Sequence, residues 1–172
     1  LTFPVLILLL LRMNPLSNGL GIGNWRKGLW LSFLASIAVL LSCFLIARVP
    51  AMQFYYSAPR WGSGDTQSIL LGEWARLRAL IGWEFLFRGR LLFPLYQAFG
   101  PVANLIQATL CAVAHMHKPL VELYGSFPFA LFLGYLARRS GSVWYGVCVH
   151  WLLGFSLEFY IVMGNKGLIP FL

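Results

Sequence analysis

Residues 29–49 form an almost unbroken apolar run of about 20 residues, the length an α-helix needs to cross the roughly 30 Å hydrocarbon core of a bilayer. Few folds remain open to such a run, because a backbone surrounded by lipid must satisfy its hydrogen bonds internally, as a helix does. Of the 172 residues, 59% are hydrophobic and only 10% are charged. The sequence therefore predicts an integral membrane protein rather than a soluble domain.

The chain on either side of this run divides into further segments. Residues 1–11 are apolar and lack the charged start of a signal peptide, so we interpret them as the surviving end of a transmembrane helix in a truncated chain. Residues 50–66 are rich in Pro, Gly and aromatic residues, which predicts an interfacial loop with Tyr55, Tyr56 and Trp61 at headgroup depth.

Four later helices are expected from apolar periodicity and from the Gly and Pro residues between them. The first starts amphipathic near the surface and turns inward. The predicted ranges are residues 67–99, 102–117, 120–137 and 142–163. The fold class is thus all-α: a polytopic transmembrane helix bundle, with residues 1–172 forming a single integral-membrane domain.

The formal net charge of +8 arises from 13 Lys and Arg against 5 Asp and Glu. A nucleic-acid partner would require these basic residues to line an exposed face, but most of them flank apolar runs, so no nucleic acid is expected. The positive-inside rule places one group of basic residues in the cytoplasm. With one crossing per helix, this group comprises Arg12, Arg26, Lys27, Arg138 and Arg139.

Glu84 and Arg88 lie inside an apolar segment, where ionisable side chains are costly unless they are paired or face a cavity. Their i, i+4 spacing puts them on one helix face, where they can form an ion pair. A purely structural pair that pins two helices is about as probable as a functional one.

His115, Lys118 and Glu122 follow the spacing i, i+3 and i+7, which is one helical face if the helix continues through Pro119. His117 points away from that face on an ideal helix and is expected to cap the helix end near water.

His150 and Glu158 lie two turns apart on one predicted face, with Gly154 leaving space between them. A membrane histidine is often only hydrogen-bonded to a neighbouring helix. Two histidines and a glutamate on three helices, however, are the groups that hydrolysis requires: one takes a proton from water and others hold charge on oxygen. This convergence favours a hydrolytic site in a polar intramembrane cavity.

Three segments resemble the motifs of one family, the CPBP intramembrane proteases, which are related to type II CAAX prenyl endopeptidases and to bacteriocin-processing or immunity proteins. They are "EFLFRG" from Glu84, "AVAH" ending at His115, and "GVCVHWLLG" around His150. The "GYLARRSGSVW" segment before the last motif also resembles that family. The resemblance extends over about half of the chain, within a family-like core of about residues 67–163.

The chain departs from the usual motifs at three positions. Trp83 stands where the family has the first of two adjacent glutamates, Cys111 where it has Phe, and Gly154 where it has Asn. The pattern His115-x-x-Lys118-Pro-x-x-Glu122 resembles a bacterial branch with an "HxxKPxxE" second motif. If the chain follows that branch, Glu84 is the working carboxylate. If it does not, Trp83 occupies the position of the base and the protein is an inactive relative.

The resemblance implies an intramembrane endopeptidase that cleaves a membrane-associated protein or a prenylated or lipidated peptide. Glu84 would activate a water as general base, and His115 and His150 would orient it, stabilise the oxyanion or bind a divalent metal such as zinc. These residues can equally work as a metal-free hydrogen-bonding site, and a metalloprotease-like hydrolase is slightly favoured. The supporting residues are Arg88, Lys118, Glu122 and Glu158.

The resemblance also implies lipid contact and a location in the bacterial inner membrane. Two alternatives of other classes remain. One is a non-catalytic scaffold or immunity protein that binds a peptide or lipid in the same cavity. The other, ranked lowest, is a transporter or channel component, because no inverted repeat or pore-lining charge ring is apparent.

Overall fold

The computed structural model describes residues 16–56 and 66–169, and every regular element in these two ranges is helical. In chain order the elements are η1 (Leu16–Leu20), α2 (Trp25–Ile46), α3 (Pro50–Tyr56), α4 (Thr66–Glu84), η2 (Phe85–Leu92), α5 (Phe93–Phe99), α6 (Val102–Val113), α7 (Leu120–Ser140) and α8 (Trp144–Asn165). The predicted all-α class is confirmed.

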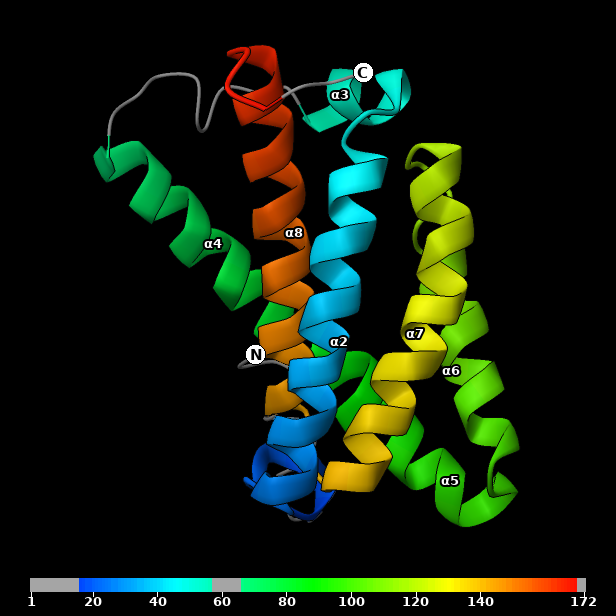
Figure 1. Cartoon of the computed structure of the whole chain (residues 1–172). Coiled ribbons are helices and arrows are strands. Elements are labelled where there is room, and N and C mark those ends of the chain that lie inside the picture. Colours follow the sequence, from blue (N-terminus) through cyan, green and yellow to red (C-terminus); the bar gives the residue numbers. More distant parts are fainter. Residues whose placement is uncertain (1–15, 57–65, 170–172) are drawn as a thin grey trace.

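The helices α2, α7 and α8 stand side by side and form the centre of the bundle (Figure 1). Each is long and apolar enough to cross a membrane. Buried side chains from all three, such as Val39, Leu133 and Ile161, pack into one hydrophobic cluster. Many large apolar residues on their outer faces, including Trp30, Phe33 and Tyr135, remain exposed, which suits contact with lipid chains. The architecture is that of a membrane helix bundle.

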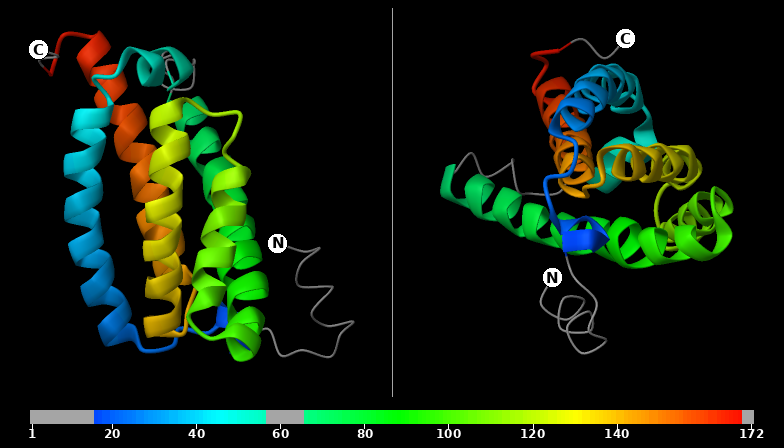
Figure 2. Two further views of the ribbon diagram at one scale, coloured as in Figure 1. Left: turned by 90° about the vertical axis from the view of Figure 1, so that its right-hand side faces the viewer. Right: turned by 90° about the horizontal axis from the view of Figure 1, so that it is seen from below.

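The α4–η2–α5 run continues helically over the predicted range 67–99, lying along one side of the bundle against α8 and α6 (Figure 2). Its central part, Phe85–Leu92, is π-helical. The sequence periodicity did not predict this widening. π-Segments inside α-helices are frequent at functional sites, and this one carries Arg88 and Gly89. A Cβ at Gly89 would lie 2.8 Å from the carbonyl oxygen of Asn18, so the glycine permits η1 to approach.

Two predictions near the first crossing were wrong in part. The helix predicted over residues 29–49 begins earlier, at Trp25, because the Asn24 side chain accepts a hydrogen bond from the Lys27 amide and caps the first turn. Residues 50–56 form α3 instead of a loop, since proline is well suited to the first turn of a helix. The rest of that predicted loop, with Trp61, lies outside the described residues, as do Arg12 and residues 1–11.

The second-motif helix also ends earlier than predicted. α6 stops at Val113, and residues 114–117 form turns that lead to Pro119. α7 then extends three residues beyond its predicted end and stops at Gly141, which adopts a left-handed conformation with φ of 74°.

The basic residues predicted for one side of the membrane lie at one end of the bundle. The Asn24 amide donates to the Ser140 carbonyl over 2.6 Å, which joins the start of α2 to the end of α7. Arg26, Lys27, Arg138 and Arg139 therefore lie close to one another along the bundle axis. α3 and the end of α8 lie at the opposite end (Figure 1).

This arrangement gives a topology test. With the basic end in the cytoplasm, a cysteine replacing the exposed Arg139 should react only with reagents applied from the cytoplasmic side. A cysteine replacing the exposed Lys166, at the far end of α8, should react only from outside. Labelling in sealed vesicles of known orientation measures both, and reaction of both from one side would refute the assignment.

Candidate active site

Glu84 and Arg88 form an ion pair at the junction of α4 and η2. The Arg88 Nη1 atom lies 3.2 Å from Glu84 Oε1, and the two side chains are 1% and 0% exposed. Arg88 Nη1 also lies 3.9 Å from the Cys111 Sγ atom on α6. The pair expected from the i, i+4 spacing is therefore in contact, and it joins the first motif to the second.

His150, on α8, meets the same carboxylate. Its Nδ1 atom is 2.7 Å from Glu84 Oε1, and because a carboxylate paired with arginine only accepts hydrogen bonds, Nδ1 is the donor. Space for this contact depends on Gly146, where a Cβ would lie 3.0 Å from Glu84 Oε2. In the neutral form of the ring, the lone pair is then on Nε2.

His115 lies in the turn that follows α6, and it is held in a similar way. Its Nδ1 atom donates to the Cys111 carbonyl oxygen over 2.8 Å, since a carbonyl can only accept. The ring packs edge-to-face on Trp83, with centroids 5.5 Å apart. The hydrogen bond that anchors His115 uses Nδ1 only, so Nε2 does not take part in it.

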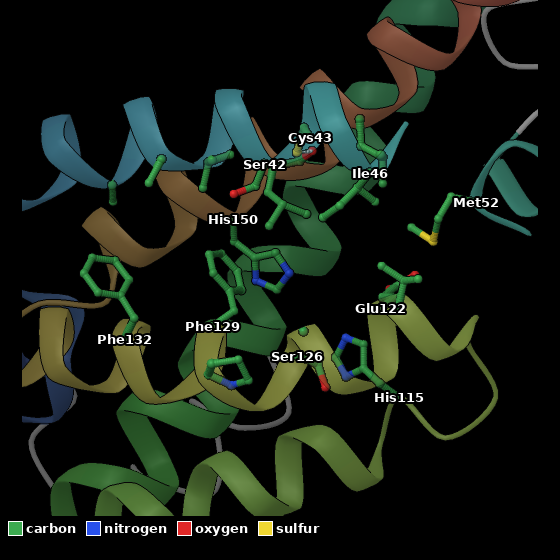
Figure 3. A pocket seen from close by; sticks show the side chains of 18 of the residues that line it. Ser42, Cys43, Ile46, Met52, His115, Glu122, Ser126, Phe129, Phe132 and His150 are labelled. Carbon is green, nitrogen blue, oxygen red and sulfur yellow. Dashed lines mark hydrogen bonds between the residues drawn. The ribbon is translucent and has the colours of Figure 1, made fainter. Parts of the chain in front are cut away.

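Two adjoining cavities, of about 390 and 400 Å³, meet at these histidines. The first lies between α2 and α7 and is mostly apolar, and His115 and His150 point toward it from different elements (Figure 3). The second lies between α4, the end of α6 and α8. Residues that line both are Tyr56, His115, Glu122, His150, Leu153 and Leu157.

Glu84 is not among the described residues that line either cavity. It is completely buried behind Arg88 and His150, both of which face the first cavity. The carboxylates that do reach the cavities are Glu122, in both, and Glu158, in the second.

Lys118 and Glu122 form an ion pair of 3.5 Å across the start of α7, despite the break at Pro119. Tyr56 donates its hydroxyl to Glu122 Oε2 over 2.5 Å. Tyr55 and Tyr56 were both predicted to lie at headgroup depth; in the structure α3 turns Tyr56 toward the cavities, while Tyr55 stays exposed. Tyr56 reaches the site because residues 50–56 form the helix α3. The sequence did not predict this helix, because the prolines in this segment indicated a loop.

Glu158 pairs with Arg76 of α4, which lies in the first half of the helix predicted over residues 67–99, the part expected to be amphipathic near the surface. The Arg76 Nε atom also lies 3.4 Å from Glu73 Oε2. Arg76 precedes Leu80 and Trp83 at helical spacing, and all three line the second cavity. This spacing is the sequence feature from which Arg76 could have been predicted to face the site.

His117 is exposed, as a residue near water would be, although it also borders the second cavity. It does not cap α6, which ends four residues earlier. The prediction that His117 points away from the face of His115 assumed an ideal helix. Residues 114–117 form turns instead, so this assumption does not hold.

The residues around the histidines do not make a complete metal site. Catalytic zinc usually has three protein ligands. In the described ranges, no group of three or more His, Cys, Asp or Glu side chains is placed to hold a metal ion. His115 and His150 have the supporting hydrogen bonds that metal ligands often show, but Glu84 Oε1 is taken up by Arg88 and His150.

Comparison with known proteins gives one match. A family model described as "Type II CAAX prenyl endopeptidase Rce1-like" matches residues 66–156, just over half of the chain, and this range contains all three motifs. No curated protein and no solved structure matches the chain.

Proposed function

Because the chain belongs to the Rce1-like type II CAAX prenyl endopeptidase family, a family of proteases, we propose that it is an intramembrane endopeptidase. Its substrate would be a membrane-associated protein or a prenylated or otherwise lipidated peptide. One observation carries this proposal: His115 and His150, from two separate motifs, line the same cavities with both Nδ1 atoms already engaged. Both Nε2 atoms are then left for a water or a substrate in that shared space.

In this mechanism Glu84 acts through His150. The carboxylate holds the Nδ1 proton and stabilises the imidazolium that forms when His150 Nε2 removes a proton from water. His115 Nε2 accepts the other water hydrogen and orients the attack. The water oxygen bonds to the scissile carbonyl carbon, the C–N bond then breaks, and His150 returns its proton to the departing amine. This assigns Glu84 a more indirect role than the base expected from the sequence.

The first cavity supports a lipidated substrate. Its walls include Ala35, Val39, Phe129 and Phe132, and α2 and α7, which flank it, both face lipid on their outer sides. A hydrocarbon chain in this space would leave water for the apolar lining, and its attached peptide would extend toward the histidines. Such a substrate is consistent with an integral protein of the bacterial inner membrane.

Purified protein in proteoliposomes, incubated with a farnesylated peptide ending in a CAAX sequence, tests the proposal. We expect cleavage by the wild type and a loss of about 10²-fold or more in Glu84→Gln, because the amide no longer stabilises the imidazolium. Mass spectrometry of the products gives the bond cleaved. Exposed Arg78→Gln on the same helix is the matched control and should cleave normally.

A non-catalytic scaffold or immunity protein is the second candidate function. The specific observation that favours it is the Trp83 ring against His115, together with the burial of Glu84 away from both cavities. In that case the wild type should bind the farnesylated peptide without cutting it, and Glu84→Gln should bind it equally well if the variant folds.

A further inference from the structure

Arg76 places a fixed positive charge in the wall of the second cavity. Its side chain is 12% exposed, and two acidic residues engage different atoms of its guanidinium. Nη2 pairs with Glu158 on α8, and Nε lies 3.4 Å from Glu73 on α4. These two contacts fix the orientation of the planar guanidinium group. The position of its third nitrogen, Nη1, is fixed as a result.

Nη1 lies against Gly154, one helical turn beyond His150. A Cβ built at Gly154 would overlap Nη1, so the guanidinium occupies the place where a side chain at this position would begin. Arg76 can lie this close to α8 only because residue 154 has no side chain. The outcome is a hydrogen-bond donor in the same cavity as both histidines.

We propose that Arg76 is a catalytic residue, whose guanidinium donates a hydrogen bond to the scissile carbonyl oxygen and stabilises its negative charge in the transition state. This inference rests on the proposed function. As water attacks and His150 takes its proton, the carbonyl π electrons move to the oxygen. Arg76 keeps its protons throughout and is unchanged when the C–N bond breaks. A preorganised donor contributes strongly to such a step.

The same geometry accounts for two features of the sequence. Gly154 stands where the motifs that this chain resembles have Asn, and the Arg76 guanidinium occupies the space in which a side chain at this position would begin. Glu158, two turns beyond His150, lies on the face expected from the sequence, but its partner is Arg76 rather than His150. Glu158 is thereby a positioning residue that holds the donor.

Steady-state kinetics of Arg76→Gln and Glu158→Gln separate this role from a structural link between α4 and α8. We expect Arg76→Gln to lower kcat by about 10²–10³-fold with KM changed by less than about threefold, the size typical for loss of one oxyanion donor. Glu158→Gln leaves the guanidinium present and should cost about tenfold or less. Equal losses from the two variants would show a structural ion pair and overturn the inference.

A rescue design covers the possibility that Arg76 variants are damaged in other ways. Combining Arg76→Ala with Gly154→Asn restores a donor in the vacated space, so the double variant should recover at least about tenfold in kcat over Arg76→Ala alone. Gly154→Ala alone should displace Nη1 and lower kcat while leaving Arg76 in the chain. A double variant no better than Arg76→Ala, in a folded protein, would count against the assignment.

Binding measurements test the role of Arg76 without relying on cleavage of the substrate. The probes are the farnesylated peptide and its phosphinate isostere, which carries a tetrahedral anion in place of the scissile amide. Wild type should prefer the phosphinate, and Arg76→Gln should reduce that preference by about 10²-fold. No preference, or one that survives Arg76→Gln, overturns the role of Arg76. If the preference for the phosphinate depends on Arg76 but no peptide is cleaved, the proposed hydrolysis is refuted, and Arg76 remains the residue that donates a hydrogen bond to the anion.

Discussion

Arg88→Ala is expected to leave the protein poorly folded and scarce in the membrane, as well as inactive. Glu84 is 0% exposed, and Arg88 is its closest compensating cation, at 3.2 Å. Removal of one member of a buried ion pair typically costs about 3–5 kcal/mol, because the other charge stays buried without compensation. This is a large share of the stability of most domains.

Membrane abundance and thermal unfolding in detergent measure this effect. Arg78→Ala, which removes an exposed arginine from α4, is the control and should accumulate normally. The double variant Glu84→Gln with Arg88→Met should recover much of the lost stability, since neither buried charge remains. Normal abundance and full activity in Arg88→Ala would mean that the pair is not formed in the membrane.

The parts of the site that were predictable are those set by local helical geometry. Glu84 with Arg88 and Lys118 with Glu122 are both four residues apart, and both pairs form. The second survives Pro119 because this proline immediately precedes α7 and leaves Glu122 in its first turn.

The parts that were not predictable depend on contacts between distant segments. Arg76 and Glu158 are joined only when α4 packs on α8, and neither residue's own helix indicates this partner. Tyr56 reaches Glu122 only through α3. The burial of Glu84 likewise results from Arg88, His150 and Gly146 closing around it, so its position behind the cavity could not be read from a motif.

The π-helical segment η2 was also not predictable from the sequence, but for a different reason. Hydrophobic periodicity distinguishes a helix from a strand, but it does not distinguish α-helical from π-helical turns within a stretch of eight residues. The sequence thus predicted one helix through residues 67–99 but not the local geometry at Arg88 and Gly89.

His115→Gln is expected to abolish most proteolysis, whereas His117→Gln should retain it. The two residues lie in the same turn region, but only His115 lines both cavities, and its Nδ1 atom is anchored on the Cys111 carbonyl. Glutamine at 115 cannot present an equivalent imidazole nitrogen to the water, and loss of one such group often costs a factor of about 10²–10³. His117 is exposed and borders only the second cavity, so its replacement should change kcat by less than about threefold.

Cleavage of the farnesylated peptide by both variants, compared at equal amounts of folded protein, measures the difference. Because the two substitutions are chemically identical and two residues apart, general damage to the turn would affect both alike. An inactive His117→Gln beside an active His115→Gln would refute the assignment of the second motif. The catalytic water would then belong on the α4 side of the site, where His117 and Arg76 line the second cavity, and not at the meeting point of the two cavities.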